Sequence, residues 1–405
     1  MQHISGRHER MSSESTLSNS LATDAQFIIY SALPSHYALG PAETCENVAS
    51  ALSKYARITI ISVGTDRLTG AKIDASMLSK DQQTRPFARI FIPNDMLLFP
   101  RLFRYIAKGK GPLVLHCLFD YRFVLVAFCF AILVGRKPIF HFPHGMLLDV
   151  VFEHNRCLKT VFCWVYRLTN VGVRVTHIAS SKLEERDIRR RLGPRASVYV
   201  IPQVTSLPPE FRNASPRGRI PNEPLQVCFV GRVCKQKNLI YAIEILSKLD
   251  FQISMDVIGS IEDEAYFYLC KEKIRGLPGN IQGDVRGPLE RSELLKRLPN
   301  YDILFAPTLG ENHGHSILEA LGVGLPVLIS DLCPWTDIND FGGGWSFPLS
   351  KRSLFADALR KAFHSGPEWA DVRRSAYKYF DEKNNTARIE ADYVRVILGA
   401  GRQGS

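Results

Sequence analysis

Short apolar segments alternate with amphipathic ones along almost the whole chain, and this alternation constrains the fold more than any other feature. Segments that we interpret as strands are QFIIY, RITIISVG, PLVLHCLF, KPIFHFPHG and SVYVIPQV in the first half, and LQVCFVGRV, FQISMDVIGS, NIQGDVRGP, YDILFAPT and PVLIS in the second. Most of the segments between them have the spacing of amphipathic helices. Strands that alternate with helices form a parallel sheet covered on both faces. The sequence therefore predicts an α/β fold.

The alternation is interrupted by one Pro- and Asn-rich stretch, SLPPEFRNASPRGRIPNEP. Such a composition favours a connection between domains, and 405 residues exceed what one hydrophobic core usually organises. We predict two Rossmann-like, doubly wound domains that face each other across a cleft. The predicted parts are a disordered Ser-rich tail over 1–24, a first domain over 25–202, a linker over 203–224, a second domain over 225–375, and C-terminal helices over 376–398 that cross back to the first domain.

Cysteine usage and hydropathy narrow the class of protein. The nine cysteines are scattered without a C-x-x-C pair, which indicates a reduced chain and neither a disulfide framework nor a zinc site. The first two dozen residues lack the apolar core of a secretion signal. The apolar run over 123–134 is shorter than the ~20 residues that span a bilayer. We expect a cytoplasmic protein in which 123–134 form a buried helix.

The net charge of +11 is confined to the first half of the chain. From Asp24 to Pro202 there are 24 Lys and Arg against 13 Asp and Glu, whereas residues 203–405 hold 25 of each. The sequence shows no nucleic-acid-binding motif, so we expect no nucleic-acid partner. The remaining interpretations are an anionic membrane, an anionic acceptor, or a basic face that is only solvated.

One segment of the basic half has the pattern of a membrane-surface helix. Arg156, Lys159 and Arg167 alternate with apolar and aromatic residues in NRCLKTVFCWVYRLT. A basic amphipathic helix with aromatics can lie on an anionic membrane. A helix packed on its own domain gives the same pattern, and the sequence leaves both interpretations open.

The densest chemical pattern follows the strand YDILFAPT, where a turn leads into a helix at about residue 315. The loop after a strand of a doubly wound sheet lies at the edge where ligands bind. A helix start there offers N–H groups and a partial positive charge of about half a unit, which suits a diphosphate. Glu319 could bind a ribose hydroxyl, and Glu311 could reach a sugar. The candidate residues of this stretch for binding a phosphate- and sugar-containing ligand are Glu311, Asn312, His313, Gly314, His315, Ser316 and Glu319.

A second pattern follows the strand LQVCFV. Gly231 and Arg232 come directly after it, and Lys235 and Lys237 follow. Fixed cations at a strand end form a phosphate clamp, in which arginine acts as a fork and lysine as a point charge. The alternative is a solvated loop with ordinary basic residues. The presence of the Glu311–Glu319 pattern in the same half of the chain argues against this alternative.

Together these residues resemble a known family. F-V-G-R-x4-K-N and the E-x7-E stretch within E-N-H-G-H-S-I-L-E-A-L-x-x-G-x-P-V resemble the retaining family 4 glycosyltransferases of the GT-B fold, over residues 27–398. The S-D-x-x-P-W segment after them resembles the branch that builds bacterial surface polysaccharides. The resemblance implies a first domain that binds the acceptor and a second that binds the nucleotide sugar.

The resemblance also implies roles for single residues. Arg232 and Lys237 match the pair that neutralises the donor diphosphate, Glu311 the acid that holds the donor sugar, and Glu319 the acid that holds the ribose. His313 stands where the family often has an aromatic residue. This departure leaves the shape of the sugar pocket open.

In the first half, Gly40 resembles the family's glycine loop, which approaches the donor phosphates. The segment P-H-G-M-L resembles the one whose histidine points into the cleft, which favours His144. His141 competes for that role, and a histidine held only by backbone groups is the alternative for either. His116 is expected to pack or to line the cleft.

The expected activity is a metal-independent transfer of a hexose. No Asp-x-Asp motif follows a strand, so neither a metal nor another cofactor is expected, and the cations and the helix dipole would stabilise the leaving phosphate. The donor would be a UDP- or GDP-sugar and the acceptor a saccharide or polyprenyl-linked saccharide at the inner face of a membrane. The alternatives are an epimerase of the UDP-N-acetylglucosamine 2-epimerase type and a non-catalytic nucleotide-sugar-binding subunit. A nicotinamide dehydrogenase is not expected, because no G-x-G-x-x-G follows the first strand.

Overall fold

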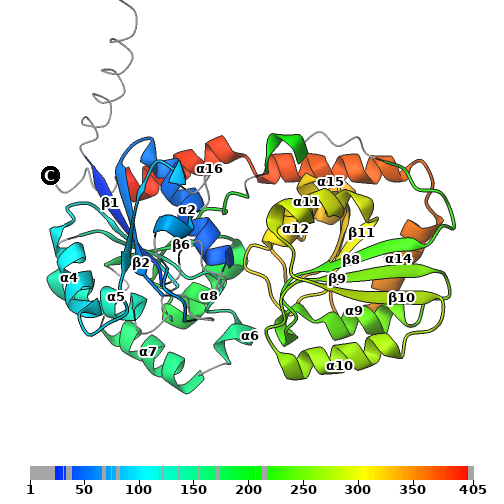
Figure 1. Ribbon diagram of the computed structural model, residues 1–405, viewed down its shortest axis with the longest axis horizontal. Helices are drawn as coiled ribbons and strands as arrows, with labels where there is room; N and C mark the ends of the chain where they lie inside the picture. The colour runs from blue at the N-terminus through cyan, green and yellow to red at the C-terminus, as the bar shows by residue number, and fades with distance from the viewer. Residues whose placement is uncertain are drawn as a thin grey trace, which may run out of the picture. The chain divides into compact units, whose positions relative to one another are not determined.

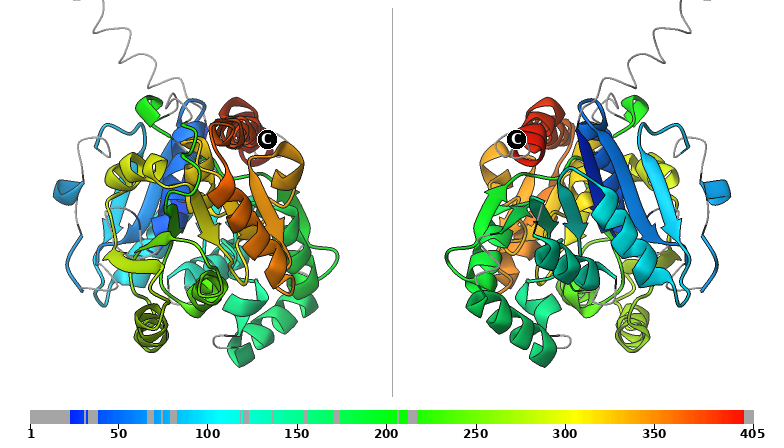
Figure 2. Two further views of the ribbon diagram at one scale, coloured as in Figure 1. Left: turned by 90° about the vertical axis from the view of Figure 1, so that its right-hand side faces the viewer. Right: turned by 90° about the vertical axis from the view of Figure 1, so that its left-hand side faces the viewer.

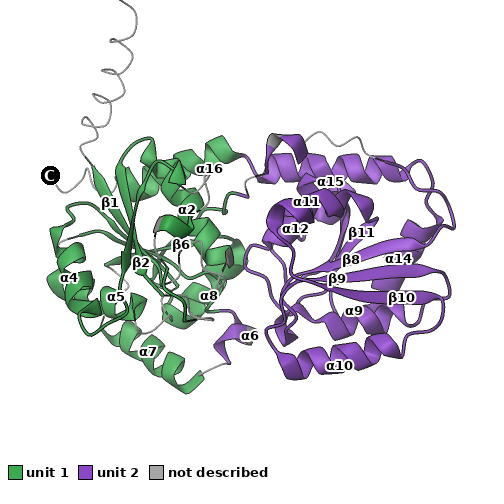
Figure 3. Cartoon of the chain, in the orientation of Figure 1, with its two compact units in different colours: residues 1–147, 155–204, 386–405 green, residues 148–154, 205–385 purple. Residues whose placement is uncertain are grey.

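The computed structural model forms two compact units, shown in different colours in Figure 3. Unit 1 comprises residues 1–147, 155–204 and 386–405, and unit 2 comprises 148–154 and 205–385. The structure describes residues 23–30, 32, 39–65, 70–73, 75–78, 83–117, 119, 123–135, 137–153, 156–169, 174–205, 207–211 and 217–399. Each unit is built on its own parallel sheet (Figure 1). The predicted α/β fold with two doubly wound domains is thus confirmed.

The sheet of unit 1 has seven parallel strands in the order β3-β2-β1-β4-β5-β6-β7. Their bounds are β1 Asp24–Ile28, β2 Arg57–Val63, β3 Ala88–Ile92, β4 Leu113–His116, β5 Ile139–Phe142, β6 Val175–Ala179 and β7 Ser197–Val200. The chain adds strands on one side of β1 and then, from β4 onward, on the other side. This reversal forms a topological switch point between β1 and β4, where doubly wound sheets bind ligands.

Helices cover both faces of this sheet (Figure 2). The helices are α2 Leu39–Ser53, α4 Leu98–Lys108, α5 Val124–Val134, α7 Arg156–Leu168, α8 Lys182–Leu192 and α16 Thr386–Tyr393, which continues as a π-helical turn, η6 Val394–Leu398. Helices α2 and α16 share one core with the strands. Because crossovers are right-handed, α4, α5, α7 and α8, which precede strands added in the opposite direction, lie on the other face. Aromatic contacts join α4 to α5 and α5 to α7.

The sheet of unit 2 has six parallel strands in the order β10-β9-β8-β11-β12-β13. They are β8 Leu225–Val230, β9 Ile253–Ile258, β10 Ile281–Gly287, β11 Ile303–Ala306, β12 Val327–Ser330 and β13 Gly344–Phe347. The helical elements are α6 Asp149–Phe152, η4 Lys235–Lys237, α9 Leu239–Leu246, α10 Glu264–Arg275, α11 Arg291–Arg297, α12 His315–Gly322, α13 Ile338–Phe341, α14 Arg352–His364 and α15 Trp369–Lys383. Two apolar cores flank the sheet. Its switch point lies between β8 and β11.

Several local details differ from the expectations. Strands β3, β6 and β13 were not among the predicted strands, because polar or glycine residues interrupt their apolar pattern. Asp24 begins β1, while residues 1–22 of the predicted tail lie outside the described residues. Helix α5 forms where expected, but it is not buried on all sides. Its residue Leu133 is exposed.

The units also divide the chain at other places than the predicted domains. The chain leaves unit 1 after Val204 and returns after Asn385, so the predicted boundary at 375/376 falls inside α15. Part of the predicted linker folds onto unit 2, since Arg219 forms an ion pair with Asp302 and its N–H donates to the carbonyl of Gly366. Residues 148–154 group with unit 2 as well. No helix among the described residues is both long and apolar enough to cross a membrane.

Candidate active site

The two motifs of the second half meet at the switch point of unit 2. Strand β8 ends at Val230 and is followed by Gly231 and Arg232, and β11 ends at Ala306 and is followed by the loop 307–314. The two strands are neighbours in the sheet. Parallel neighbours present their carboxyl ends at the same edge, and this edge binds ligands at a switch point. Segments about 75 residues apart in sequence are thereby brought to one place.

The β8 side of the site supplies the cations. Gly231 has a φ of 149°, which residues with a side chain rarely adopt. Lys237, at the end of η4, places Nζ 2.5 Å from Glu311 Oε2, and both side chains are less than one-fifth exposed. Arg232 is half exposed and forms an ion pair with Glu262, a partner that the sequence pattern did not reveal. The predicted cation pair therefore lies at the strand end, with each cation paired to a carboxylate.

Hydrogen bonds fasten the η4 turn to the loop after β11. The backbone N–H of Leu309 donates to the carbonyl of Gln236 at 2.8 Å, and Gln236 Nε2 donates to the carbonyl of Gly310 at 2.8 Å. Asn238 Nδ2 donates to the carbonyl of Pro307 at 3.0 Å. Asn238 itself has a φ of 60°, which asparagine tolerates better than most residues. Lys237 and Glu311 are thus held on one rigid backbone frame.

Helix α12 begins directly after this frame. Gly314 is its N-cap with a φ of 77°, and a Cβ at this position would lie 3.0 Å from the side chains of Glu311 and Ile317. A larger residue would be strained and crowded, so the sequence needs glycine here. The start of a helix presents its first N–H groups, here those of His315 and Ser316, together with a partial positive charge. They are suited to an anion such as a phosphate.

Glu319 lies one turn further along α12 and is buried. Arg291 Nε, at the start of α11, lies 2.5 Å from its Oε1. Arg291 was not identified from the sequence, because nothing in its neighbourhood marks it and only the packing of α11 brings it to Glu319. A buried carboxylate with a fixed donor partner is an oriented acceptor for a hydroxyl group.

His313, which stands where the resembling family often has an aromatic residue, is a packing residue. Its ring is buried and makes an edge contact with Trp335, whose Nε1 donates to the His313 carbonyl at 2.5 Å. Its Nε2 lies 3.3 Å from Thr205 Oγ1. Burial, and then the neighbouring His315, hold the pKa of His313 well below its usual range, which favours the neutral ring. The histidine therefore packs as an aromatic ring and holds the loop through its edge.

Thr205 connects this loop to the end of α15. Its hydroxyl also lies 3.4 Å from His315 Nδ1. Its N–H donates to Asn384 Oδ1 at 3.0 Å, and Asn384 Nδ2 donates to its carbonyl at 2.8 Å. The contribution of Thr205 could not be predicted from the sequence, because it stands 108 residues before His313 in a stretch without a motif.

The two predicted residues of the first half belong to unit 1. Gly40 was expected in a loop but lies in the first turn of α2, where the Thr44 hydroxyl donates to the Gly40 carbonyl. His144 follows β5 with a φ of 53°, and its Nε2 lies 2.8 Å from His116 Nδ1. Burial and the neighbouring His144 lower the pKa of His116 far below its usual range. His144 is half-buried, whereas His116 is fully buried and belongs to the core.

His141, the competitor of His144, lies inside the sheet. Its Nδ1 is 2.9 Å from His177 Nδ1, and His177 Nε2 is 2.7 Å from the hydroxyl of Tyr166 on α7. Both histidines are buried, and burial lowers the pKa of His177 to about 3. His141 is therefore a core residue, which favours His144 for contact with a substrate.

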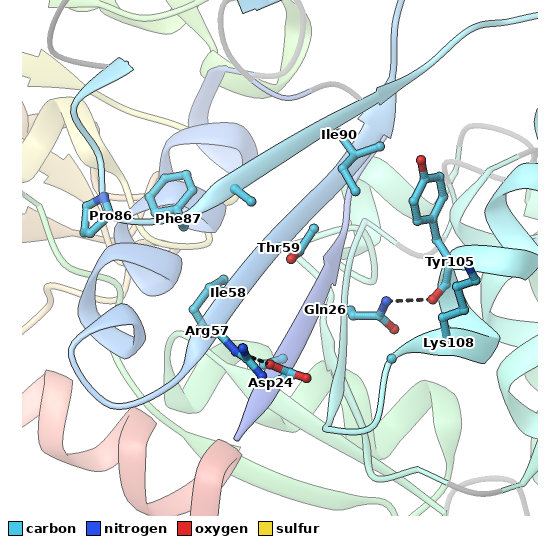
Figure 4. A pocket seen from close by; sticks show the side chains of 13 residues that line it. Asp24, Gln26, Arg57, Ile58, Thr59, Pro86, Phe87, Ile90, Tyr105 and Lys108 are labelled. Carbon is cyan, nitrogen blue, oxygen red and sulfur yellow. Dashed lines mark hydrogen bonds and ion pairs between the residues drawn. The ribbon is translucent and has the colours of Figure 1, made fainter. Parts of the chain in front are cut away.

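A hollow at the opposite edge of the unit 1 sheet is a poor candidate for the same chemistry. Figure 4 shows it between the amino ends of β1 and β2 and the end of α4, with an ion pair between Asp24 and Arg57 at its rim. Ligands of doubly wound sheets bind at the carboxyl edge. Among the described residues, no three His, Cys, Asp or Glu side chains lie together as metal ligands would.

Comparisons with known proteins give the site its context. Residues 210–379 match the family model described as "Glycosyl transferases group 1". An uncharacterized glycosyltransferase of Methanocaldococcus jannaschii is 26% identical over 145 residues, which are 33% of this chain and 35% of that protein. The match to this curated relative thus spans about a third of its length.

Solved structures are similar over nearly the whole chain. HepE of Anabaena, solved in complex with UDP and glucose, has a TM-score of 0.69 at 14% identity and covers 92% of this chain and 99% of its own. Sucrose-phosphate synthase of Thermosynechococcus elongatus has a TM-score of 0.70 at 14% identity, with 94% and 100% covered. The trehalose-phosphate synthase of Burkholderia vietnamiensis has a TM-score of 0.59 at 16% identity, with 93% and 100% covered. The residues that match this family model, 210–379, contain the site at the switch point of unit 2, and the whole chain has a fold similar to that of these solved structures.

Proposed function

We propose that the protein is a retaining family 4 glycosyltransferase that transfers a hexose from a nucleotide-diphosphate sugar to a saccharide or lipid-linked saccharide during polysaccharide synthesis. The observation that carries the proposal is the meeting of Lys237 and Glu311 at the switch point of unit 2, directly before the start of α12. A cation, an acid and a helix start within one frame suit a ligand with both phosphate and hydroxyl groups. Contact with an anionic membrane belongs to the same proposal.

In this proposal, the donor-free site holds its own charges in balance. Lys237 pairs with Glu311, and Arg232 pairs with Glu262. When the donor binds, its diphosphate takes over as the partner of the two cations and of the α12 N-terminus. Glu311 is then released to accept hydrogen bonds from the sugar hydroxyls. Glu319, oriented by Arg291, accepts the ribose hydroxyls.

The proposed reaction breaks the bond between the anomeric carbon and the leaving phosphate oxygen. A new bond forms between this carbon and an acceptor hydroxyl oxygen, on the same face of the sugar, and the hydroxyl proton passes to the leaving phosphate. The cations and the helix start stabilise the charge that develops on this phosphate. We propose that no divalent metal is required. His144 of unit 1 is the proposed residue beside the transferred sugar, and Gly40 the one beside the donor phosphates.

UDP-glucose is the first donor to test, since HepE was solved with UDP-glucose and with UDP and glucose. GDP-, ADP- and CMP-sugars complete the set. Purified protein is incubated with each labelled donor, with and without a mixture of saccharide and polyprenyl-linked acceptors. Acceptor-dependent release of the nucleotide diphosphate, with a product that keeps the donor's anomeric configuration, is the expected result.

The alternatives give different products. An epimerase converts the sugar to an isomer without an acceptor and releases no nucleotide, and a non-catalytic subunit binds the donor without turnover. Glu311→Gln keeps the size of the side chain and is expected to abolish transfer while the protein stays folded. Near-normal turnover in this variant would contradict the proposed site.

A further inference from the structure

Helix α7 of unit 1 turns its apolar side outward, away from its own core. Its exposed large apolar residues are Leu158 (61%), Val161 (57%), Trp164 (63%), Val165 (45%) and Leu168 (63%). They are spaced three and four positions apart and therefore form one stripe along the helix, called the outer stripe below. Of the 19 exposed large apolar residues found in the described part of the chain, five lie on this one helix. Such clustering differs from the scattered exposure of ordinary surfaces.

The inner side of α7 carries one cation that was expected to face outward, Lys159. Lys159 is 9% exposed, and its Nζ lies 5.7 Å from the centre of the Phe119 ring. Cys163 is buried, and the Tyr166 hydroxyl is fixed by His177 of β6. This orientation corrects the expectation that Lys159 is one of the cations of a membrane-facing side. Because the inner side is anchored, the helix cannot turn its outer stripe into the protein.

The part of the sequence that contains α7 is rich in positive charge. Residues 101–195, which include most of α4 and all of α5, α7 and α8, hold 17 Lys and Arg against six Asp and Glu. This surplus of 11 equals the net charge of the entire chain. Arg156 and Arg167 are exposed at the two ends of α7, and Lys182 and Arg190 are exposed on α8, which contacts α7. Figure 3 shows α7 at the outside of unit 1.

We propose that the outer stripe of α7 docks into the headgroup region of an anionic lipid bilayer. A helix with an apolar, Trp-containing side and flanking cations lies in the interface plane, where tryptophan is favoured. A second copy of the chain is a poor occupant, since two such faces would bring together two layers of the same charge. A membrane partner agrees with the proposed lipid-linked acceptor, so this proposal rests in part on the proposed function.

Binding to vesicles tests the proposal without any activity measurement. The full chain is mixed with vesicles of phosphatidylcholine alone or with about one-third phosphatidylglycerol, and bound protein is separated by flotation. We expect binding to the anionic vesicles that weakens with salt and is far weaker to the neutral ones. The triple variant V161S/W164S/L168S should lose at least about tenfold in partitioning, and Arg156→Gln roughly fivefold on anionic vesicles.

A matched control comes from unit 2. Tyr268 and Leu269 on α10 are exposed to a similar extent, 63% and 54%, and the variant Y268S/L269S should bind vesicles like the wild type. Trp164 supplies a second readout, because its emission should shift to shorter wavelength on binding. Trp164→Phe should abolish that shift while most of the binding remains.

The proposal would be overturned if the wild type did not bind anionic vesicles, or if the α10 control lost as much binding as the triple variant. It would also be overturned if sedimentation showed a dimer of the wild type that the triple variant does not form. Affinity for UDP, measured by calorimetry, should be the same in all variants. A protein that binds vesicles but no nucleotide would refute the proposed function and leave the docking surface intact, and the reverse result would refute only the docking surface.

Discussion

Replacing Lys237 by methionine is the most direct test of the donor site. Methionine keeps the apolar stem of the lysine and removes only the charge, so the η4 turn should stay in place. In the wild type, Nζ lies 2.5 Å from Glu311 Oε2, and both side chains are largely buried. The variant leaves the carboxylate of Glu311 without its cation, directly beside the place proposed for the diphosphate.

The size of the effect follows from two opposing contributions. A charge-assisted hydrogen bond to a phosphate contributes about 1.5–3 kcal/mol. Part of it is offset in the wild type, because Lys237 must first loosen its pair with Glu311. We therefore expect a net loss of about 1–2 kcal/mol, which corresponds to roughly 5- to 30-fold weaker UDP binding.

Titration calorimetry with UDP measures this loss of affinity, and two further variants serve as controls for the role of charge. Lys235→Met removes an exposed cation from the same turn and should leave the affinity unchanged. Glu311→Gln removes a negative charge and frees Lys237, so UDP should bind as well as in the wild type or more tightly, although transfer is lost. Equal UDP affinities of Lys237→Met and wild type, or an equal loss in Lys235→Met, would refute the reasoning.

Three further outcomes are expected. Thr205→Val should lower the free energy of unfolding by about 1–3 kcal/mol, because buried His313 loses the partner of its Nε2. Thr205→Ser keeps the hydroxyl and should unfold in urea like the wild type. Equal free energies of unfolding for the two variants would show that the hydroxyl does not contribute. Burial lowers the pKa of His177 from 6.5 in the unfolded chain to about 3 in the folded one. Its contribution to the free energy of unfolding is therefore complete above pH 6.5 and falls by about 1.4 kcal/mol per pH unit as the pH drops toward 3. Between about pH 6.5 and 5, the wild type should therefore lose about 2 kcal/mol more than His177→Gln, and parallel pH profiles would contradict this. Removal of divalent ions with EDTA should leave the initial rate of transfer unchanged, whereas a loss restored by Mg²⁺ or Mn²⁺ would disprove the proposed metal independence.

The α/β class and the motifs of unit 2 could be predicted from the sequence because their signals are local. A buried strand, a glycine-containing turn and a helix start are adjacent in the chain, so Gly231–Arg232 and the stretch from Glu311 to Glu319 are visible as strings of letters. Their place at a carboxyl edge follows from the alternation of strands and helices alone. Strands β3 and β6 were missed because polar residues, Arg89 in β3 and Thr176 and His177 in β6, interrupt their apolar segments.

The partners of these residues were decided by tertiary structure. Arg291 reaches Glu319 only because α11 packs beside α12, and Thr205 reaches His313 across 108 residues of chain. Helix α7 gives the clearest case. Its sequence establishes an amphipathic helix, but periodicity does not say which side is buried, and the anchor from Tyr166 to His177 turns the apolar side outward and Lys159 inward. Sequence fixes what is adjacent along the chain, whereas the choice of packed face depends on contacts between distant elements.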